Sequence, residues 1–127
     1  MHVLCRFHEA VREDGLMLDL EVIRPRPVVE VDGTAVCAIE GEAILGPAEA
    51  AAATIDEMVA AGLLVEDAVD DHDVLKHYST GAELVEDFTT KERNVPEEAI
   101  PLLERIDRAC VVRERCRLRR LRVTRAP

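Results

Sequence analysis

The densest group of residues that could do chemistry is Asp70, Asp71, His72 and Asp73, with His77 four residues further on. Carboxylate and imidazole groups are common ligands of divalent cations, so this group is a candidate metal site. A calcium loop would need a glycine at its sharp turn and a distal glutamate, and zinc would need three or four His or Cys ligands at characteristic spacings. The cluster has neither pattern, so we expect a solvated hairpin tip, with metal binding as the alternative.

No pattern of nucleophile and base accompanies these residues. The one serine of the chain, Ser79, lies where a helix cap is expected, and no G-x-S-x-G elbow is present. His8 beside Glu9 and His77 beside Tyr78 could transfer protons, but adjacent side chains on a helix or strand point apart. Glycine-rich phosphate loops and dinucleotide turns are also missing from the sequence. We therefore predict no catalytic site and no cofactor.

A row of arginines near the carboxyl terminus is the second candidate site. Residues 105–127 carry a net charge of +7 and residues 1–104 carry −17, which together give the −10 of the whole chain. The row could bind an acidic partner or nucleic acid, but no aromatic residues are interleaved for base stacking, and an acidic chain repels a polyanion. We expect instead that the arginines form ion pairs with acidic residues of neighbouring strands. The candidate interaction residues are Arg113, Arg115, Arg117, Arg119 and Arg120, and the expected partners include Asp19, Glu21, Glu30 and Asp32.

Helices and strands that would position these residues can be placed from periodicity and from turn signals. Asp32-Gly33 suits a tight hairpin, Thr80 with Glu83 forms a capping-box pattern, and Pro47 favours a helix start. The predicted helices are one ending over Phe7–Glu13 before an Asp14-Gly15 cap, one over Pro47–Ala61, one starting at Thr80 and one starting at Pro96. The predicted strands are Leu16–Arg24, Val28–Asp32, Thr34–Glu40, Leu63–Val69, Val74–Tyr78 and Cys110–Thr124.

Strict alternation marks the first and last of these strands. In the first, Leu16, Leu18, Leu20 and Val22 share an apolar face, and the acidic residues occupy the other face, which we expect to point outward. In the last, we assign Val112, Cys116 and Leu118 to the inner face, with a slip at Arg119-Arg120 that returns Leu121 and Val123 to it. The pattern predicts a single α+β domain over residues 1–127, with a mainly antiparallel sheet of about five or six strands and three main helices.

Composition limits the class of protein. The 127 residues are 48% hydrophobic and 33% charged, which indicates a folded, soluble chain. No apolar run is long enough for a spanning helix, and Met1–Arg6 is too short and polar for a signal peptide, so we expect no membrane partner. The four cysteines lack metal or redox spacing, which favours buried thiols in a reducing, cytoplasmic compartment. Arginine outnumbers lysine fourteen to two, typical of a GC-rich bacterial genome.

A winged-helix regulator is one alternative for residues 48–78, where a helix is followed by two predicted strands. In that interpretation the helix would read DNA and the two strands would form the wing. The helix carries Glu49, Asp56 and Glu57 and no basic residue, and the wing tip would be the acidic cluster. Such a surface repels phosphates, so this alternative is disfavoured.

Two segments resemble class I S-adenosylmethionine-dependent methyltransferases. Glu9–Leu20 is similar to the helix, glycine turn and strand that follow the cofactor half of that family, and Arg113–Arg122 is similar to its final antiparallel strand. The glycine-rich turn and the acidic residue that bind the cofactor in that family have no counterpart in this chain. The resemblance therefore implies a degenerate or split relative, or a domain similar to the carboxyl-terminal part alone.

Three functions follow as hypotheses. The leading one is a non-catalytic interaction or accessory domain that forms a homodimer, because the long final strand has a backbone edge to cover and no catalytic pattern was found. The second is a small-molecule-binding or enzymatic domain related to a methyltransferase, with a pocket near His72, His77 or the arginines. The third is nucleic-acid binding through the arginine-rich strand. A partner protein that supplies missing parts of a site is compatible with the first two.

Overall fold

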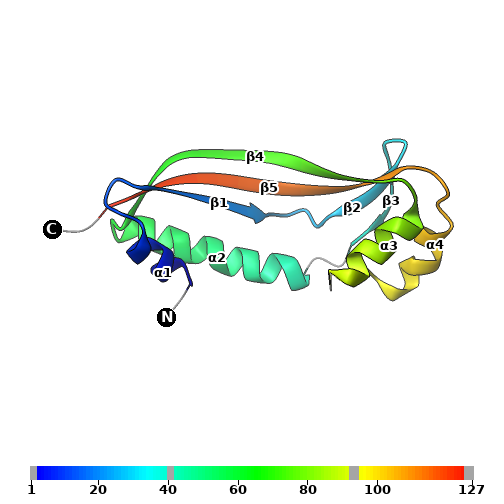
Figure 1. Ribbon diagram of the computed structural model, residues 1–127, viewed down its shortest axis with the longest axis horizontal. Coiled ribbons are helices and arrows are strands. Elements are labelled where there is room, and N and C mark those ends of the chain that lie inside the picture. The colour runs from blue at the N-terminus through cyan, green and yellow to red at the C-terminus, as the bar shows by residue number, and fades with distance from the viewer. Residues whose placement is uncertain (1–2, 40–41, 92–94, 125–127) are drawn as a thin grey trace. The chain divides into compact units, whose positions relative to one another are not determined.

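The computed structural model describes residues 3–39, 42–91 and 95–124 as an α+β fold with a five-stranded antiparallel sheet (Figure 1). The predicted fold class is therefore confirmed. The strand order is β1-β5-β2-β3, and β4 also pairs with β5. The helices are α1 (Val3–Ala10), α2 (Glu42–Ala60), α3 (Gly81–Thr90), the short 3₁₀ turn η1 (Glu97–Ala99) and α4 (Ile100–Glu104). The strands are β1 (Leu16–Val22), β2 (Val28–Val31), β3 (Thr34–Ala38), β4 (Leu64–Tyr78) and β5 (Cys110–Val123).

The chain folds into two compact units, and β4 and β5 each contribute one part to each unit. The first unit comprises Met1–Ile23, Gly46–His72 and Cys116–Pro127, and the second comprises Arg24–Leu45 and Asp73–Arg115. The first unit therefore contains α1, β1 and most of α2. The second contains β2, β3, α3, η1 and α4. Each unit has its own hydrophobic core.

The core of the first unit forms where α2 packs on β4 and β5. Its buried side chains are Ile55, Met58, Leu64, Leu121 and Val123. His8 is buried beside this core, and its Nε2 lies 3.0 Å from the carbonyl oxygen of Leu63 and 3.2 Å from that of Thr124. His8 therefore has a structural role, because it satisfies backbone acceptors of two segments far apart in the sequence.

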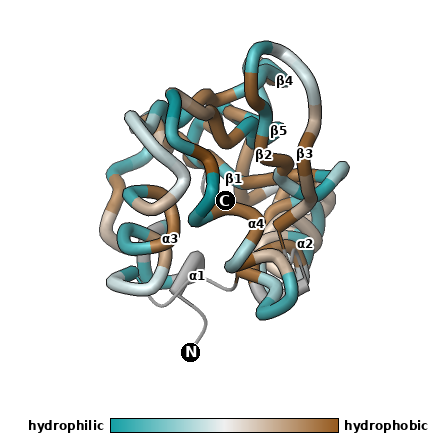
Figure 2. Tube along the Cα trace, turned by 90° about the vertical axis from the view of Figure 1, so that its right-hand side faces the viewer, coloured by the Kyte–Doolittle hydropathy of each residue, from teal (hydrophilic) through white to brown (hydrophobic). Residues whose placement is uncertain are grey.

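The core of the second unit forms between α3, α4 and the strands that face them. Phe88 and Leu103 are fully buried, and the ring of Tyr78 meets that of Phe88 edge to face, with ring centres 6.3 Å apart. Figure 2 shows that hydrophobic and hydrophilic residues interchange along α2 and α3, as expected for helices with one buried side. The remaining buried members are Val29, Ile39, Leu84, Val85, Ala99, Cys110 and Val112.

Two local predictions are confirmed. The β2–β3 hairpin turns at Asp32 and Gly33, whose φ angles of 52° and 79° are both positive, as the tight turn requires. The predicted cap at the start of α3 is also present, with the Glu83 carboxylate reaching one residue beyond the N-cap residue Thr80. The Glu83 N–H donates to Thr80 Oγ1 at 3.2 Å, and the Ser79 N–H donates to the Glu83 carboxylate at 3.2 Å.

The predicted end of the first helix and the predicted start of α2 were wrong. α1 ends at Ala10 rather than Glu13, and Asp14 rather than Gly15 has the positive φ. α2 begins at Glu42, so Pro47 lies inside it rather than at its first turn. Gly46 precedes this proline and has no Cβ to clash with the proline ring, which removes one of the clashes that a proline makes inside a helix.

The predicted hairpin at residues 70–73 was wrong, because β4 is one continuous strand of 15 residues. The segment Leu64–Tyr78 has no glycine, proline or positive φ that would form a tight turn. Its carboxylates are instead held extended by arginines of β5, as described below. Since α2 is followed by a single strand, the winged-helix alternative has no wing.

Buried and more exposed side chains alternate along β5, and the alternation shifts by one residue earlier in the strand than predicted. Cys110, Val112, Glu114 and Cys116 are buried in the first part, and Arg119, Leu121 and Val123 in the second. The phase therefore changes at Arg117-Leu118 rather than at Arg119-Arg120. Leu118 is half-buried, and Arg119 takes the inner position that the prediction gave to a leucine.

Candidate functional site

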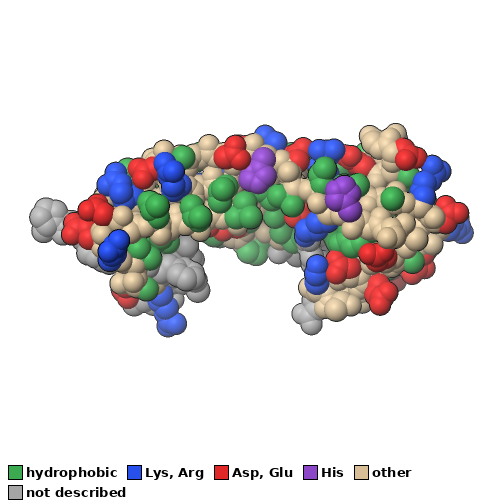
Figure 3. Space-filling model, turned by 45° about the horizontal axis from the view of Figure 1, so that its top comes forward, with side chains coloured by type: hydrophobic (Ala, Val, Ile, Leu, Met, Phe, Trp, Pro, Cys, Tyr) green, Lys and Arg blue, Asp and Glu red, His purple; other side chains and the backbone are tan. Residues whose placement is uncertain are grey.

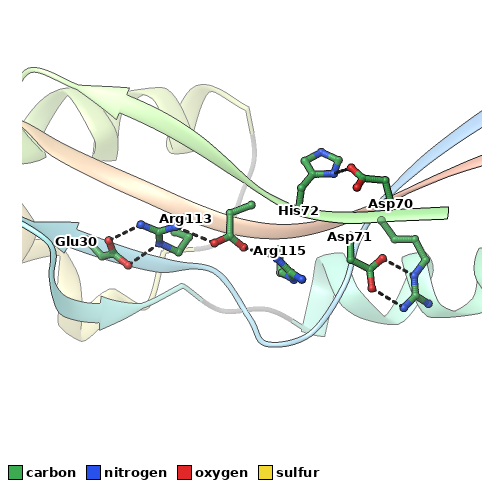
Figure 4. Close-up of polar contacts among 8 residues, drawn as sticks. Glu30, Asp70, Asp71, His72, Arg113 and Arg115 are labelled. Carbon is green, nitrogen blue, oxygen red and sulfur yellow. Dashed lines mark hydrogen bonds and ion pairs between the residues drawn. The ribbon is translucent and has the colours of Figure 1, made fainter.

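The acidic cluster does not come together as a metal site. Asp70 and His72 project from one side of β4 and Asp71 from the other, because side chains alternate along a strand (Figure 4). His72 Nδ1 lies 2.9 Å from Asp70 Oδ2, and this contact is an ion pair when the imidazole is protonated. Within residues 3–39, 42–91 and 95–124, no three His, Cys, Asp or Glu side chains are grouped so that they could hold a metal ion.

In the second unit, Arg113 is the centre of an ion-pair group (Figure 4). Its Nε and Nη2 donate to the Glu30 carboxylate at 2.9 and 3.2 Å, and its Nη1 donates to Asp73 at 2.8 Å. Arg115 Nη1 donates to the other oxygen of Asp73 at 3.2 Å. The two hydrogen bonds lower the pKa of Asp73, and the contacts with Glu30 and Asp73 raise that of Arg113. Asp73 is therefore a structural anion and not a free ligand.

In the first unit, Arg117 and Arg119 make corresponding contacts. Arg117 donates to both oxygens of Asp71, at 2.8 and 3.0 Å, and this bidentate pair raises the pKa of the guanidinium. Arg119, with a side chain only 8% exposed, donates to Glu66 at 2.6 Å and to Asp56 at 2.9 Å. These pairs hold the carboxylates of β4 and α2 against β5.

Two of the four predicted carboxylate partners make ion pairs with arginine. Glu30 pairs with Arg113, and Asp32 pairs with Arg108 at 2.7 Å. Most of the other partners lie on β4, which the sequence had divided into two short strands. Arg120 differs from its neighbours because it is exposed and makes no ion pair with the described part of the chain.

The apolar face of β1 points the opposite way from the prediction. Leu16, Leu18 and Leu20 are 58%, 70% and 57% exposed, so the leucines lie on the surface. The register explains this reversal, because Met17 lies opposite the buried Leu121 and directs the odd-numbered residues toward the core. Figure 3 shows hydrophobic side chains exposed among charged ones on the face of the molecule that it presents. We call Leu16, Leu18 and Leu20 the leucine face.

Two carboxylates share the inner face of β1 with Met17. Asp19 and Glu21 are two residues apart on one side of the strand, and Asp19 Oδ2 is buried without a hydrogen-bond partner among the described residues. Burial is the main cause that raises the pKa of Glu21 to about 7, and the charge and hydrogen bond of Asp19 add to it. Contrary to the prediction, neither forms an ion pair with an arginine in the part of the chain that the structure describes.

The second unit has two pockets of interest. The larger, of about 670 Å³, is an open hollow lined by residues that include Lys76, His77, Tyr78 and Lys91. Within it the Tyr78 hydroxyl donates to Asp87 at 2.6 Å, and this bond and that of Lys91 lower the pKa of Asp87. The smaller pocket, of about 210 Å³, is lined by Pro25, Arg26, Val28, Asp73, Arg113 and Arg115. Sequence patterns did not indicate Arg26 as a site residue.

The described cysteines Cys37, Cys110 and Cys116 are thiols rather than halves of a disulfide. Burial is the main cause that raises the pKa of Cys37 and of Cys110, so these two are poor nucleophiles near neutral pH. The predicted buried thiol at Cys5 has a side chain outside the described residues. None of the described helices is both long and apolar enough to cross a membrane.

Comparison of the chain with models of protein families, with curated proteins and with solved structures finds no match.

Proposed function

We propose that this chain is a non-catalytic interaction domain that forms a homodimer through the leucine face. The observation that carries the proposal is the exposure of Leu16, Leu18 and Leu20 side by side on one face of β1. Scattered exposed leucines are normal on a protein surface, but three in strict alternation form one patch. Such a patch is typical of a surface that another protein covers.

A second copy of the chain fits this patch for two reasons. A two-fold interface brings the same patch of both copies together, and an apolar patch is complementary to itself. An exposed cation also borders it. Arg120 lies opposite Leu18 in the β1–β5 register and has no ion pair within the described residues, so its guanidinium can pair with a carboxylate of the second copy.

The expected affinity is modest. Completing the burial of a leucine that is already partly covered contributes about 1–2 kcal/mol, so six leucines give roughly 6–12 kcal/mol. Association costs of about 4–15 kcal/mol offset much of this gain. We therefore expect a dissociation constant between about 1 μM and 1 mM.

Sedimentation velocity over that concentration range tests the proposal. The native chain is expected to shift from monomer to dimer, and Leu18→Asp is expected to remain monomeric because it buries a charge in the interface. Leu102→Asp is the matched control, since Leu102 is an exposed leucine of the second unit, outside the leucine face. A native chain that stays monomeric up to about 1 mM, or equal loss of dimer in both variants, would refute the homodimer.

The larger pocket favours a second candidate function, small-molecule binding. His77, one of the residues that the sequence placed near a pocket, lines this hollow with both lysines of the chain. The resemblance to methyltransferases makes S-adenosylmethionine and S-adenosylhomocysteine the first ligands to try. A rise in melting temperature with either, lost in His77→Ala, would support this function, and no rise with either would count against it.

A further inference from the structure

The smaller pocket of the second unit brings three guanidinium groups together in an acidic protein. Arg26, Arg113 and Arg115 line it beside Pro25 and Val28. The acidic groups that contact these arginines are Asp73 and Glu30. The three arginines and two carboxylates together carry a charge of about +1. The net charge of the whole chain is −10.

The three arginines differ in how many donors they have already used. Arg113 uses all three of its guanidinium nitrogens, because Nε and Nη2 donate to Glu30 and Nη1 donates to Asp73. Arg115 uses only Nη1, in a single bond of 3.2 Å to Asp73. Arg26 is exposed and makes no ion pair with the residues that the structure describes. Free N–H donors therefore remain on Arg115 and Arg26, on the wall of one pocket.

We propose that this pocket binds the carboxylate group of a small organic acid, with Arg26 and Arg115 as the ligating residues. A guanidinium fork matches the two oxygens of a carboxylate, and Glu30 already accepts two hydrogen bonds from Arg113 in this way. One carboxylate brings the local charge to zero. A phosphate dianion would leave an excess negative charge beside Asp73 and Glu30.

The remaining lining defines the rest of the ligand. Pro25 and Val28 give the pocket an apolar part, against which a short hydrocarbon chain can pack. A volume of about 210 Å³ is close to that of seven liquid waters. The pocket therefore accommodates a monocarboxylate with a short aliphatic chain, or the end of a larger ligand. This site shares no residue with the leucine face, so the two proposals fail or succeed independently.

A titration of the full chain with hexanoate, followed through the Nε–Hε signals of its arginines by NMR at low salt, tests the site. We expect saturable shifts of the Arg26 and Arg115 signals with a dissociation constant of about 1 mM. Hexanol, which has the same apolar chain and no charge, is expected to cause no shift. The Arg26→Gln variant is expected to bind about tenfold more weakly, because it loses charge-assisted hydrogen bonds.

Arg120→Gln is the matched control, since it also removes one exposed arginine without an ion pair among the described residues. It is expected to bind hexanoate within about twofold of the native chain. The proposal would be overturned by the absence of saturable shifts up to about 20 mM hexanoate, or by equal weakening in the two variants. Tighter binding of inorganic phosphate than of hexanoate would overturn the assignment of a carboxylate.

Discussion

Replacement of Arg119 with alanine tests how the first unit is held together. The Arg119 side chain is 8% exposed and donates to Glu66 on β4 and to Asp56 on α2, at 2.6 and 2.9 Å. The substitution removes the cation and leaves both carboxylates beside the core. The resulting loss of stability therefore measures how much Arg119 contributes by joining α2, β4 and β5.

The expected loss follows from the exposure of the two carboxylates. Breaking a fully buried pair costs about 3–5 kcal/mol, whereas an exposed pair contributes about 0–1 kcal/mol. The Asp56 side chain is 69% exposed and belongs to the second class, whereas that of Glu66, at 33%, lies between the two. With the lost packing of the arginine stem, we expect Arg119→Ala to lower the free energy of unfolding by about 2–4 kcal/mol.

Urea unfolding at pH 7, followed by circular dichroism and by the fluorescence of Tyr78, measures this loss. Tyr78 is the only tyrosine and lies in the second unit, so the two signals separate the units if they unfold independently. Arg120→Ala is the control at the adjacent position, and we expect it to change the free energy by less than about 0.5 kcal/mol. The reasoning would be refuted if Arg119→Ala cost no more than Arg120→Ala.

Three further predictions concern the stability of the fold. Because folding raises the pKa of Glu21 from an ordinary 4.5 to about 7, its contribution is fully present below pH 4.5 and is lost as the pH rises through 7. Glu21→Gln is expected to flatten the fall in melting temperature between pH 5 and 8, and an unchanged slope would contradict a pKa raised by the burial of Glu21 beside Asp19. Gly81→Ala is expected to destabilise the chain by about 2 kcal/mol or more in urea, despite the better helix propensity of alanine, because the new Cβ would lie 1.8 Å from the Leu103 carbonyl oxygen. A chain truncated after Ala109 lacks β5, which pairs with β1, β2 and β4. It should show no cooperative thermal transition by circular dichroism, and a retained transition would show that β5 is dispensable.

The ion pairs explain why the acidic cluster was misplaced by sequence patterns. Four consecutive residues of the type Asp-Asp-His-Asp favour a turn when they are considered alone, because their charges repel and their side chains prefer solvent. In the structure Asp71 pairs with Arg117, and Asp73 pairs with Arg113 and Arg115. These partners are more than 35 residues away in the chain, so no local pattern contains them.

Features that depend on neighbouring residues could be predicted from the sequence alone. Examples are the hairpin at Asp32-Gly33, the capping box of Thr80 and Glu83, and the alternation of leucines in β1, all of which are set by backbone angles or by side-chain period. The predicted α+β class followed from the same signals.

Contacts between distant segments determine which side of β1 is covered and which arginines keep free N–H donors. Alternation establishes that Leu18 and Asp19 point to opposite sides, but the side that faces α2 depends on the register between Met17 and Leu121. Likewise, Arg26 and Arg115 line one pocket because β5 passes close to a segment nearly ninety residues earlier in the chain. The leucine face and the proposed carboxylate site both depend on such distant contacts, which local sequence patterns do not encode.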